Sequence, residues 1–157
     1  MYSHLRQLGH LSASHIDDSY LQGDDYDECE RNVRDTVKLF DSLGFTVHPE
    51  KSSFVPQQRI TFMGFLIDSI TMTVYPTSEK IEKTIHTCQD LLECPHPTVR
   101  EVASTLGFLI SNFPAAKLGP LPFRSLDMDK TEALHLNKGN FDGFMQLFEL
   151  SRNDLQW

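Results

Sequence analysis

The chain has 157 residues and a formal net charge of -8, from 22 acidic and 14 basic side chains. Its composition, with 39% apolar and 23% charged residues, is that of an ordinary globular protein and argues against a disordered chain. No apolar run approaches the roughly 20 residues that a membrane-spanning helix needs, and the N-terminus lacks the pattern of a secretory signal.

The three cysteines, Cys29, Cys88 and Cys94, are odd in number and include no C-x-x-C pair, which argues against a disulfide framework. Reduced thiols are typical of the cytosol and the nucleus. We therefore expect an intracellular protein, cytoplasmic or nuclear, that is neither secreted nor held in a membrane.

The first elements in the chain are a predicted short helix over residues 2–8 and two short strands over residues 11–16 and 19–21. The strands form a predicted hairpin whose turn carries Asp17 and Asp18. Adjacent carboxylates at the tip of a rigid hairpin are hard oxygen ligands, of the kind that Mg²⁺-dependent phosphoryl transfer requires. The alternative is a plain polar turn, because aspartate is a common turn residue.

A longer helix is predicted to begin after Asp25, which forms a capping-box pattern with Glu28. Its apolar residues recur at steps of three and four along one stripe: Tyr26, Cys29, Val33, Val37, Phe40 and Leu43. Gly44 ends this helix, and residues 45–47 predict a strand.

Residues 59–68 and 70–75 alternate with the two-residue rhythm of strands, and we expect a second hairpin with its connection near Asp68 and Ser69. Thr77 or Ser78 then caps a predicted helix. Its expected buried face consists of Ile81, Ile85, Cys88 and Leu92.

A capping box of Thr98 and Glu101 opens the next predicted helix, which Pro114 ends. Its apolar positions are Val99, Val102, Leu106, Leu109, Ile110 and Phe113. Residues 117–124 read as a connector, and residues 129–136 as one or two helical turns. Asn140 is expected to cap a last helix that carries Phe141, Phe144, Leu147, Phe148 and Leu155; the alternative is that this helix folds back on the preceding ones.

Four motifs stand in a recognisable order in the chain: His15-Ile16-Asp17-Asp18, Leu43-Gly44-Phe45 followed by Lys51, Phe62-Met63-Gly64-Phe65, and residues 98–121. In this order they resemble the second half of a reverse transcriptase palm and the thumb that follows it. The first three resemble the Tyr-x-Asp-Asp hairpin, the Gly-Phe turn with its lysine, and the Phe-Leu-Gly hairpin called the primer grip. The chain is most similar to retrotransposon polymerases of the DIRS-like and gypsy-like groups.

The resemblance implies an α+β fold, in which an antiparallel palm-type sheet with one packed helix is followed by a helical thumb. It divides the chain into a partial palm over residues 1–75, thumb and connection helices over residues 76–126, and the start of a connection or ribonuclease H-proximal segment over residues 127–157.

The resemblance also implies roles for individual residues. Asp17 and Asp18 match the metal-binding aspartates, Lys51 matches a lysine near the leaving pyrophosphate, and His15 stands where the family has a tyrosine that contacts the sugar. Candidate nucleic-acid contacts are Met63 and Gly64 in the primer grip and Arg100, Lys117 and Arg124 in the thumb. Simpler alternatives are an exposed polar residue for His15, solvated cations for the basic residues and a strand bulge at Gly64.

The implied function is RNA-directed DNA polymerisation with two Mg²⁺ or Mn²⁺ ions in the complete enzyme, acting on an RNA template and a DNA primer. In the family a further aspartate comes from an upstream strand, so we expect this chain to be an inactive fragment by itself. The net charge of -8 predicts weak or no binding of nucleic acid by the chain alone. The alternative is a non-catalytic relic that acts as a protein-interaction module and self-associates through exposed apolar faces.

Overall fold

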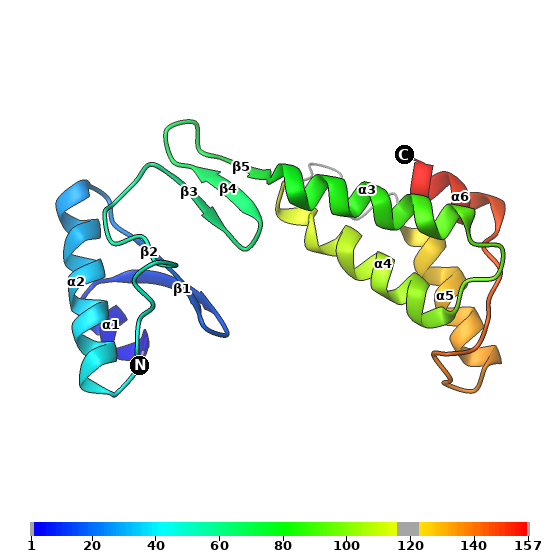
Figure 1. Cartoon of the computed structure of the whole chain (residues 1–157), viewed down its shortest axis with the longest axis horizontal. Helices are drawn as coiled ribbons and strands as arrows, with labels where there is room; N and C mark the ends of the chain where they lie inside the picture. Colours follow the sequence, from blue (N-terminus) through cyan, green and yellow to red (C-terminus); the bar gives the residue numbers. More distant parts are fainter. Residues whose placement is uncertain (1, 116–122, 157) are drawn as a thin grey trace. The chain divides into compact units, whose positions relative to one another are not determined.

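The computed structural model describes residues 2–115 and 123–156 (Figure 1). The described residues form six α-helices, one short 3₁₀ helix and two small antiparallel sheets, which confirms the predicted α+β class. The chain divides into two compact units, Met1–Gln58 and Arg59–Trp157, whereas the sequence-based division had its boundaries at residues 75 and 126. None of the helices in the described parts is long and apolar enough to cross a membrane.

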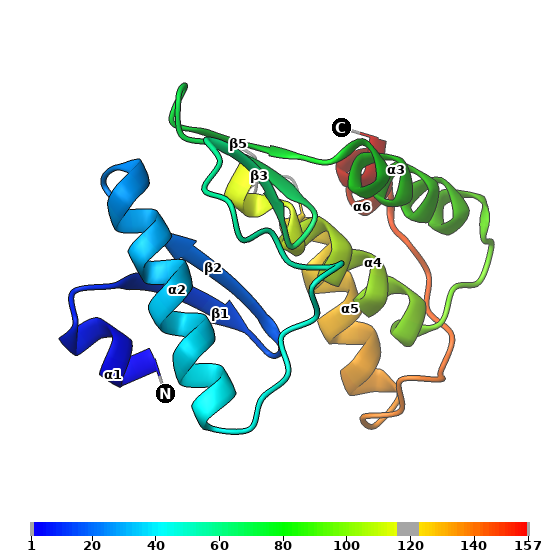
Figure 2. The same ribbon diagram turned by 60° about the vertical axis from the view of Figure 1, so that its left-hand side comes forward.

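The first unit consists of α1 (Tyr2–Gln7), β1 (Leu11–His15), β2 (Asp18–Gln22) and α2 (Tyr26–Ser42). The two strands form the predicted hairpin, with Leu11 opposite Gln22 at its open end. Helix α2 packs against β2, and α1 packs against both β1 and α2 (Figure 2). Both helices therefore support a hairpin that has no third strand among the described residues.

Local hydrogen bonds define both ends of α2. The Asp25 carboxylate accepts a hydrogen bond from the Glu28 amide at 2.8 Å, as the capping pattern predicted. At the other end Gly44 adopts a positive φ of 80°, and the Phe45 amide donates to the Phe40 carbonyl at 2.9 Å. This is a Schellman motif, and the two phenylalanine rings lie 6.1 Å apart between centroids. The predicted strand over residues 45–47 is wrong, because Phe45 is used to close the helix.

The second unit begins with a three-stranded antiparallel sheet of β3 (Arg59–Phe62), β4 (Phe65–Asp68) and β5 (Thr73–Pro76), in that order. The prediction of one strand over residues 59–68 is wrong, because Met63 and Gly64 form a two-residue turn within it. Both have positive φ angles, 51° and 76°, which is the pattern of a type I′ turn. A two-residue turn shifts the alternation by one residue, because the paired residues Phe62 and Phe65 project to the same side of the sheet.

Asp68 fixes the connection between β4 and β5. One of its carboxylate oxygens accepts hydrogen bonds from the Ile70 and Thr71 amides, and the other accepts from Arg59 Nε at 2.8 Å. Burial opposes the charge on this carboxylate, but the hydrogen bond from Arg59 and those from the two amides outweigh burial and hold the pKa of Asp68 below its usual value. The connection therefore spans residues 69–72, and β5 begins later than predicted.

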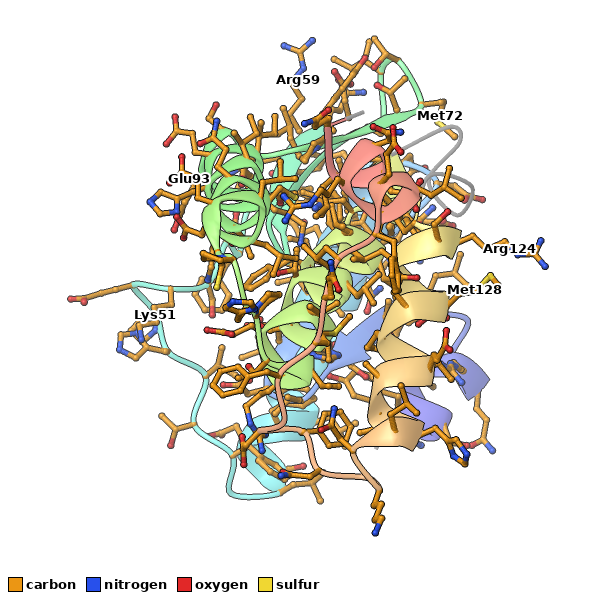
Figure 3. The ribbon with its side chains drawn as sticks, turned by 90° about the vertical axis from the view of Figure 1, so that its right-hand side faces the viewer. Lys51, Arg59, Met72, Glu93, Arg124 and Met128 are labelled. Atoms are coloured by element: carbon orange, nitrogen blue, oxygen red, sulfur yellow. The ribbon has the colours of Figure 1, made fainter. Side chains whose placement is uncertain are left out.

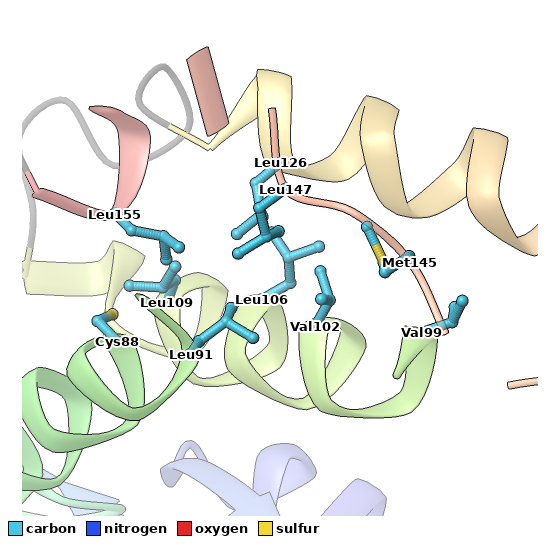
Figure 4. Close-up of a cluster of buried hydrophobic side chains, with 10 residues drawn as sticks. All are labelled: Cys88, Leu91, Val99, Val102, Leu106, Leu109, Leu126, Met145, Leu147 and Leu155. Carbon is cyan, nitrogen blue, oxygen red and sulfur yellow. The ribbon is translucent and has the colours of Figure 1, made fainter. Parts of the chain in front are cut away.

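Four helices complete the second unit: α3 (Ser78–Glu93), α4 (Val99–Ser111), α5 (Arg124–Leu136) and α6 (Glu149–Gln156). The 3₁₀ helix η1 (Phe113–Ala115) follows α4 and contains Pro114. The buried core lies between the four helices and the segment that precedes α6 (Figure 4). It consists of Cys88, Leu91, Val99, Val102, Leu106, Leu109, Leu126, Met145, Leu147 and Leu155.

The predicted caps of α3 and α4 are confirmed. Thr77 caps α3, and the side chains of Thr98 and Glu101 form the capping box of α4. Hydrogen bonds from the Thr98 amide and hydroxyl lower the pKa of Glu101. The predicted buried face of α3 is partly wrong, because Ile81 and Ile85 are 42% and 51% exposed.

The predicted last helix over residues 140–155 is also partly wrong, because α6 begins only at Glu149. The preceding segment lies along the N-terminus of α4: the Val99 and Arg100 amides donate to the Gly143 and Phe141 carbonyls at 3.0 and 2.8 Å. The first amides of a helix have no carbonyl partner within that helix. If residues 140–148 were helical, the Val99 and Arg100 amides of α4 would lose these two hydrogen bonds. Helix α6 then packs against α5 and α3, which is the alternative in which the last helix folds back.

Candidate metal and nucleic-acid site

The two aspartates lie at the tip of the β1–β2 hairpin. His15 pairs with Asp18, so Ile16 and Asp17 are the two turn residues and Asp18 is the first residue of β2. Both carboxylates are exposed, and neither forms a hydrogen bond or an ion pair with a described residue. Four carboxylate oxygens are therefore free to accept a cation at this tip.

The turn itself is strained. Ile16 has a φ of 53°, a conformation in which a β-branched residue is rare, and its side chain is 92% exposed. A positive φ at the first turn residue and not at the second is the pattern of a type II′ turn, where glycine is preferred. Neither the backbone conformation nor burial of the side chain favours isoleucine here. Strained backbone of this kind concentrates at functional sites, which makes the tip a candidate.

The base of the hairpin is held by a buried asparagine of α2. Asn32 is fully buried, and its Nδ2 donates to the Leu11 and Gln22 carbonyls at 2.8 and 2.9 Å, one on each strand. Its side-chain oxygen accepts a hydrogen bond from Thr36 Oγ1 at 3.1 Å. The open end of the hairpin is therefore tied to the helix, and the aspartates lie at the opposite end.

The two faces of the hairpin carry different residues at its tip. Directly paired residues of an antiparallel hairpin project to the same side, so His15 and Asp18 share a face. Ser19 projects to the other side, where its hydroxyl is hydrogen-bonded to that of Tyr2 in α1. His15 and Asp18 therefore lie on the face opposite to the one that α1 contacts.

The two carboxylates are ligands of the chemical type that Mg²⁺ and Mn²⁺ prefer. Magnesium sites commonly use one or two carboxylates and complete their octahedral geometry with water and substrate phosphates. In the described parts of the chain, no group of three or more His, Cys, Asp or Glu side chains is placed to hold a metal ion. A metal ion at this tip would have Asp17 and Asp18 as protein ligands, with phosphate and water oxygens supplying the rest.

The other predicted residue of the first unit is Lys51, in the loop that follows α2 (Figure 3). Its side chain is exposed, and no hydrogen bond or ion pair joins it to Asp17, Asp18 or any other described residue. The structure therefore groups His15, Asp17 and Asp18 at the hairpin tip but leaves Lys51 outside this group.

In the second unit, Met63 and Gly64 form the turn between β3 and β4. A Cβ added to Gly64 would lie 3.1 Å from Cδ of Lys80, so the absence of a side chain leaves room for this lysine. The Gly64 carbonyl accepts a hydrogen bond from the Thr77 amide at 2.9 Å. These contacts give Gly64 a packing role in addition to the nucleic-acid role expected from the resemblance, and the alternative of a bulge within one strand is wrong.

The predicted thumb cations have different surroundings. Arg100 Nε is 2.7 Å from the Asp142 carboxylate, and its guanidinium lies over the Phe141 ring. The hydrogen bond with Asp142 raises the pKa of Arg100 and lowers that of Asp142. Arg124, the first residue of α5, extends away from its helix (Figure 3), and Lys117 lies outside the described residues.

Two structurally important groups were not found from the sequence. Asn32 and Thr36 stand four residues apart within the stripe that α2 buries. Polar residues at helical spacing inside an apolar stripe are the signal that could have identified their buried hydrogen bonds. Lys80 and Lys83 stand three residues apart on α3, and each contacts an aromatic ring.

The chain was compared with known protein families, with characterised proteins and with solved structures, and none of the three comparisons gave a match.

Replacing Asn32 by alanine is expected to loosen the base of the hairpin. The change removes both hydrogen bonds to the strand ends and should destabilise the hairpin by about 1–3 kcal/mol, the usual range for a lost buried hydrogen-bonding group. Amide hydrogen exchange of residues 11–22 measures this effect. The control is Arg34→Ala, an exposed position on the same helix. Equal exchange in the two variants would show that Asn32 does not hold the base of the hairpin.

Replacing Ile16 by glycine is expected to stabilise the hairpin by about 0.5 kcal/mol. Relief of about 1–2 kcal/mol of backbone strain exceeds the extra chain entropy of glycine, about 0.4–1 kcal/mol. Thermal denaturation and hydrogen exchange at residues 15–19 check the direction. Ile16→Val keeps the β-branch and should give no gain; a destabilised glycine variant would show that the turn is not strained.

Proposed function

We propose that the chain is part of the RNA-directed DNA polymerase of a retrotransposon, of the DIRS-like or gypsy-like type. One observation carries the proposal: Asp17 and Asp18 stand exposed, and unpaired with any described residue, at the tip of a hairpin that is anchored at its opposite end. The order of the four sequence motifs supports the same assignment.

In this function, Asp17 and Asp18 hold divalent cations beside the end of a growing nucleic-acid strand. Bound Mg²⁺ supplies Lewis-acid stabilisation of the charge that develops during nucleotidyl transfer. The protein's contribution is to hold the two carboxylates in place, and anchoring of the hairpin by Asn32 serves that purpose. His15 shares a face with Asp18, where it can contact a bound nucleotide.

The second unit supports the assignment through the order of its elements. An antiparallel sheet with a two-residue turn at Met63 and Gly64 is followed directly by packed helices. We assign β3 to β5 to the end of the palm, residues 76–126 to the thumb and connection helices, and residues 127–157 to the start of a connection or ribonuclease H-proximal segment. The type I′ turn presents Met63, which is 45% exposed, as a residue that can contact a primer.

Binding of Mn²⁺ is expected to be localised at the hairpin tip. Paramagnetic Mn²⁺ should broaden the amide NMR signals of residues 15–19 first, because Asp17 and Asp18 are adjacent, exposed and unpaired. The double variant Asp17→Asn/Asp18→Asn should lose this broadening.

The matched control for that experiment is Asp24→Asn/Asp27→Asn, which removes two exposed carboxylates from the same unit. This control should retain the broadening at the tip. Broadening spread evenly over all acidic segments, or equal loss in both double variants, would contradict a metal site at Asp17 and Asp18.

The 157-residue chain is expected to incorporate no detectable deoxynucleotide on a primed RNA template with Mg²⁺ or Mn²⁺. Two-metal chemistry needs carboxylates from more than one backbone element, and the described residues bring no third ligand to Asp17 and Asp18. Loss of one group that stabilises charge in the transition state typically raises the activation barrier by about 3–4 kcal/mol. Robust incorporation that Asp17→Asn abolishes would overturn this expectation.

A second candidate function is that of a non-catalytic interaction module. Several large apolar side chains of the second unit are more than half exposed: Met128, Leu136, Phe144, Phe148 and Leu150. Exposed apolar residues in such number favour association with a partner or a second copy. This function requires no metal at the hairpin tip, so the Mn²⁺ experiment separates the two candidates.

A further inference from the structure

Two lysines of α3 are held over aromatic rings on the surface of the second unit. Lys80 Nζ is 4.7 Å from the centroid of the Phe65 ring in β4, and Lys83 Nζ is 4.8 Å from that of Phe108 in α4. Lys80 Nζ also donates a hydrogen bond to Ser111 Oγ at 3.1 Å. Helices α3 and α4 pack side by side (Figure 1), so both ammonium groups lie along the line where these helices meet.

Neither lysine forms an ion pair with a carboxylate of the described residues. Glu79 stands four residues before Lys83, a spacing that favours an ion pair on a helix, yet Lys83 contacts the Phe108 ring. Both positive charges therefore remain available to an external anion.

The Lys80 side chain is also ordered before any ligand binds. Its stem packs against the turn at Gly64, where a Cβ would lie only 3.1 Å from Cδ of the lysine. Its ammonium is held between the Phe65 ring and the Ser111 hydroxyl, and two of its three donors are left for other partners. A side chain ordered in this way loses less conformational freedom when it binds a ligand.

Arg100, one of the two arginines that the sequence suggested, is less suitable for this role. The Arg100 guanidinium is paired with Asp142, and the Arg100 and Val99 amides at the start of α4 donate to carbonyls of residues 141 and 143. The Arg100 guanidinium and the first two amides of α4 therefore already have partners within the unit.

We propose that Lys80 and Lys83 form a contact site for the phosphate backbone of a nucleic acid. The ligand class rests on the proposed polymerase function, and the choice of residues rests on the contacts of α3. Two ammonium groups one helical turn apart can each contact a phosphate, and the neighbouring hydroxyl of Ser111 adds a polar contact. Because these contacts involve the backbone, they bind nucleic acid without selecting its sequence.

The experiment measures fluorescence anisotropy of a labelled DNA–RNA hybrid in EDTA, so that no metal at Asp17 or Asp18 contributes. Wild type is compared with Lys80→Gln/Lys83→Gln over a series of salt concentrations. Each lost phosphate contact lowers the slope of log affinity against log salt by about 1, so the double variant should lose about 2. The ratio of the two affinities should therefore fall about tenfold between 50 and 200 mM salt.

The matched control is Lys38→Gln/Lys138→Gln, which removes two exposed lysines elsewhere and changes the net charge equally. It should retain the wild-type slope. Far-UV circular dichroism and melting temperature show whether the Lys80→Gln/Lys83→Gln variant remains folded, and Lys83→Gln alone, at the exposed position, should lose about 1 in slope.

Equal losses in the two double variants would overturn the proposal, because only net charge would then matter. Failure of the wild type to bind the hybrid at low salt would overturn it as well. Neither result bears on the metal site, which the Mn²⁺ experiment tests separately. Localised Mn²⁺ broadening together with an unchanged salt slope would leave the polymerase function standing and remove only this contact site.

Discussion

The two hydrogen bonds from Asn32 to the ends of β1 and β2 are the constraint on which the candidate metal site depends. A two-stranded hairpin is marginally stable in water unless another element supports it. Here the support is polar and buried, since one amide group donates to both strands and accepts from Thr36. It acts at the end remote from Asp17 and Asp18, so the carboxylates remain exposed while the backbone that carries them is held.

In the second unit, distant parts of the chain accept hydrogen bonds from the first amides of two helices. Carbonyls of residues 141 and 143 accept from the first amides of α4, and the Asp154 carboxylate accepts from the Ser125 and Leu126 amides at the start of α5. Each bond joins segments that are more than 25 residues apart in the sequence. They place α6 and its preceding segment over the apolar core, where Met145, Leu147 and Leu155 are buried. These residues thus contribute to the same core as α3 and α4.

The surroundings of the cations in the second unit bear on how an acidic chain could bind a nucleic acid. The chain carries a net charge of -8, and its cations differ in their surroundings. Arg59 and Arg100 are neutralised by Asp68 and Asp142, whereas Lys80 and Lys83 are placed over aromatic rings. An acidic surface that leaves particular cations unpaired can still bind a polyanion at those cations, but weakly and with strong dependence on salt.

The sequence alone determined the α+β class, the hairpin at Asp17 and Asp18, and the caps at Asp25, Thr77 and Thr98, because each follows from contacts between residues only a few positions apart. Only the tertiary structure decided which residues are buried and which cations are paired. Ile81 and Ile85 fit a buried stripe but are exposed, and residues 140–148 fit a helix but instead satisfy the first amides of α4. The turn at Met63 and Gly64 interrupts the alternation that was read as one strand, because the positions on one face shift from Ile60 and Phe62 to Phe65 and Ile67; the resemblance to the primer grip had matched these two residues to a turn. The exposure of the two isoleucines and the conformation of residues 140–148 depended on which distant segments pack against each helix, and hydrophobic periodicity does not record that.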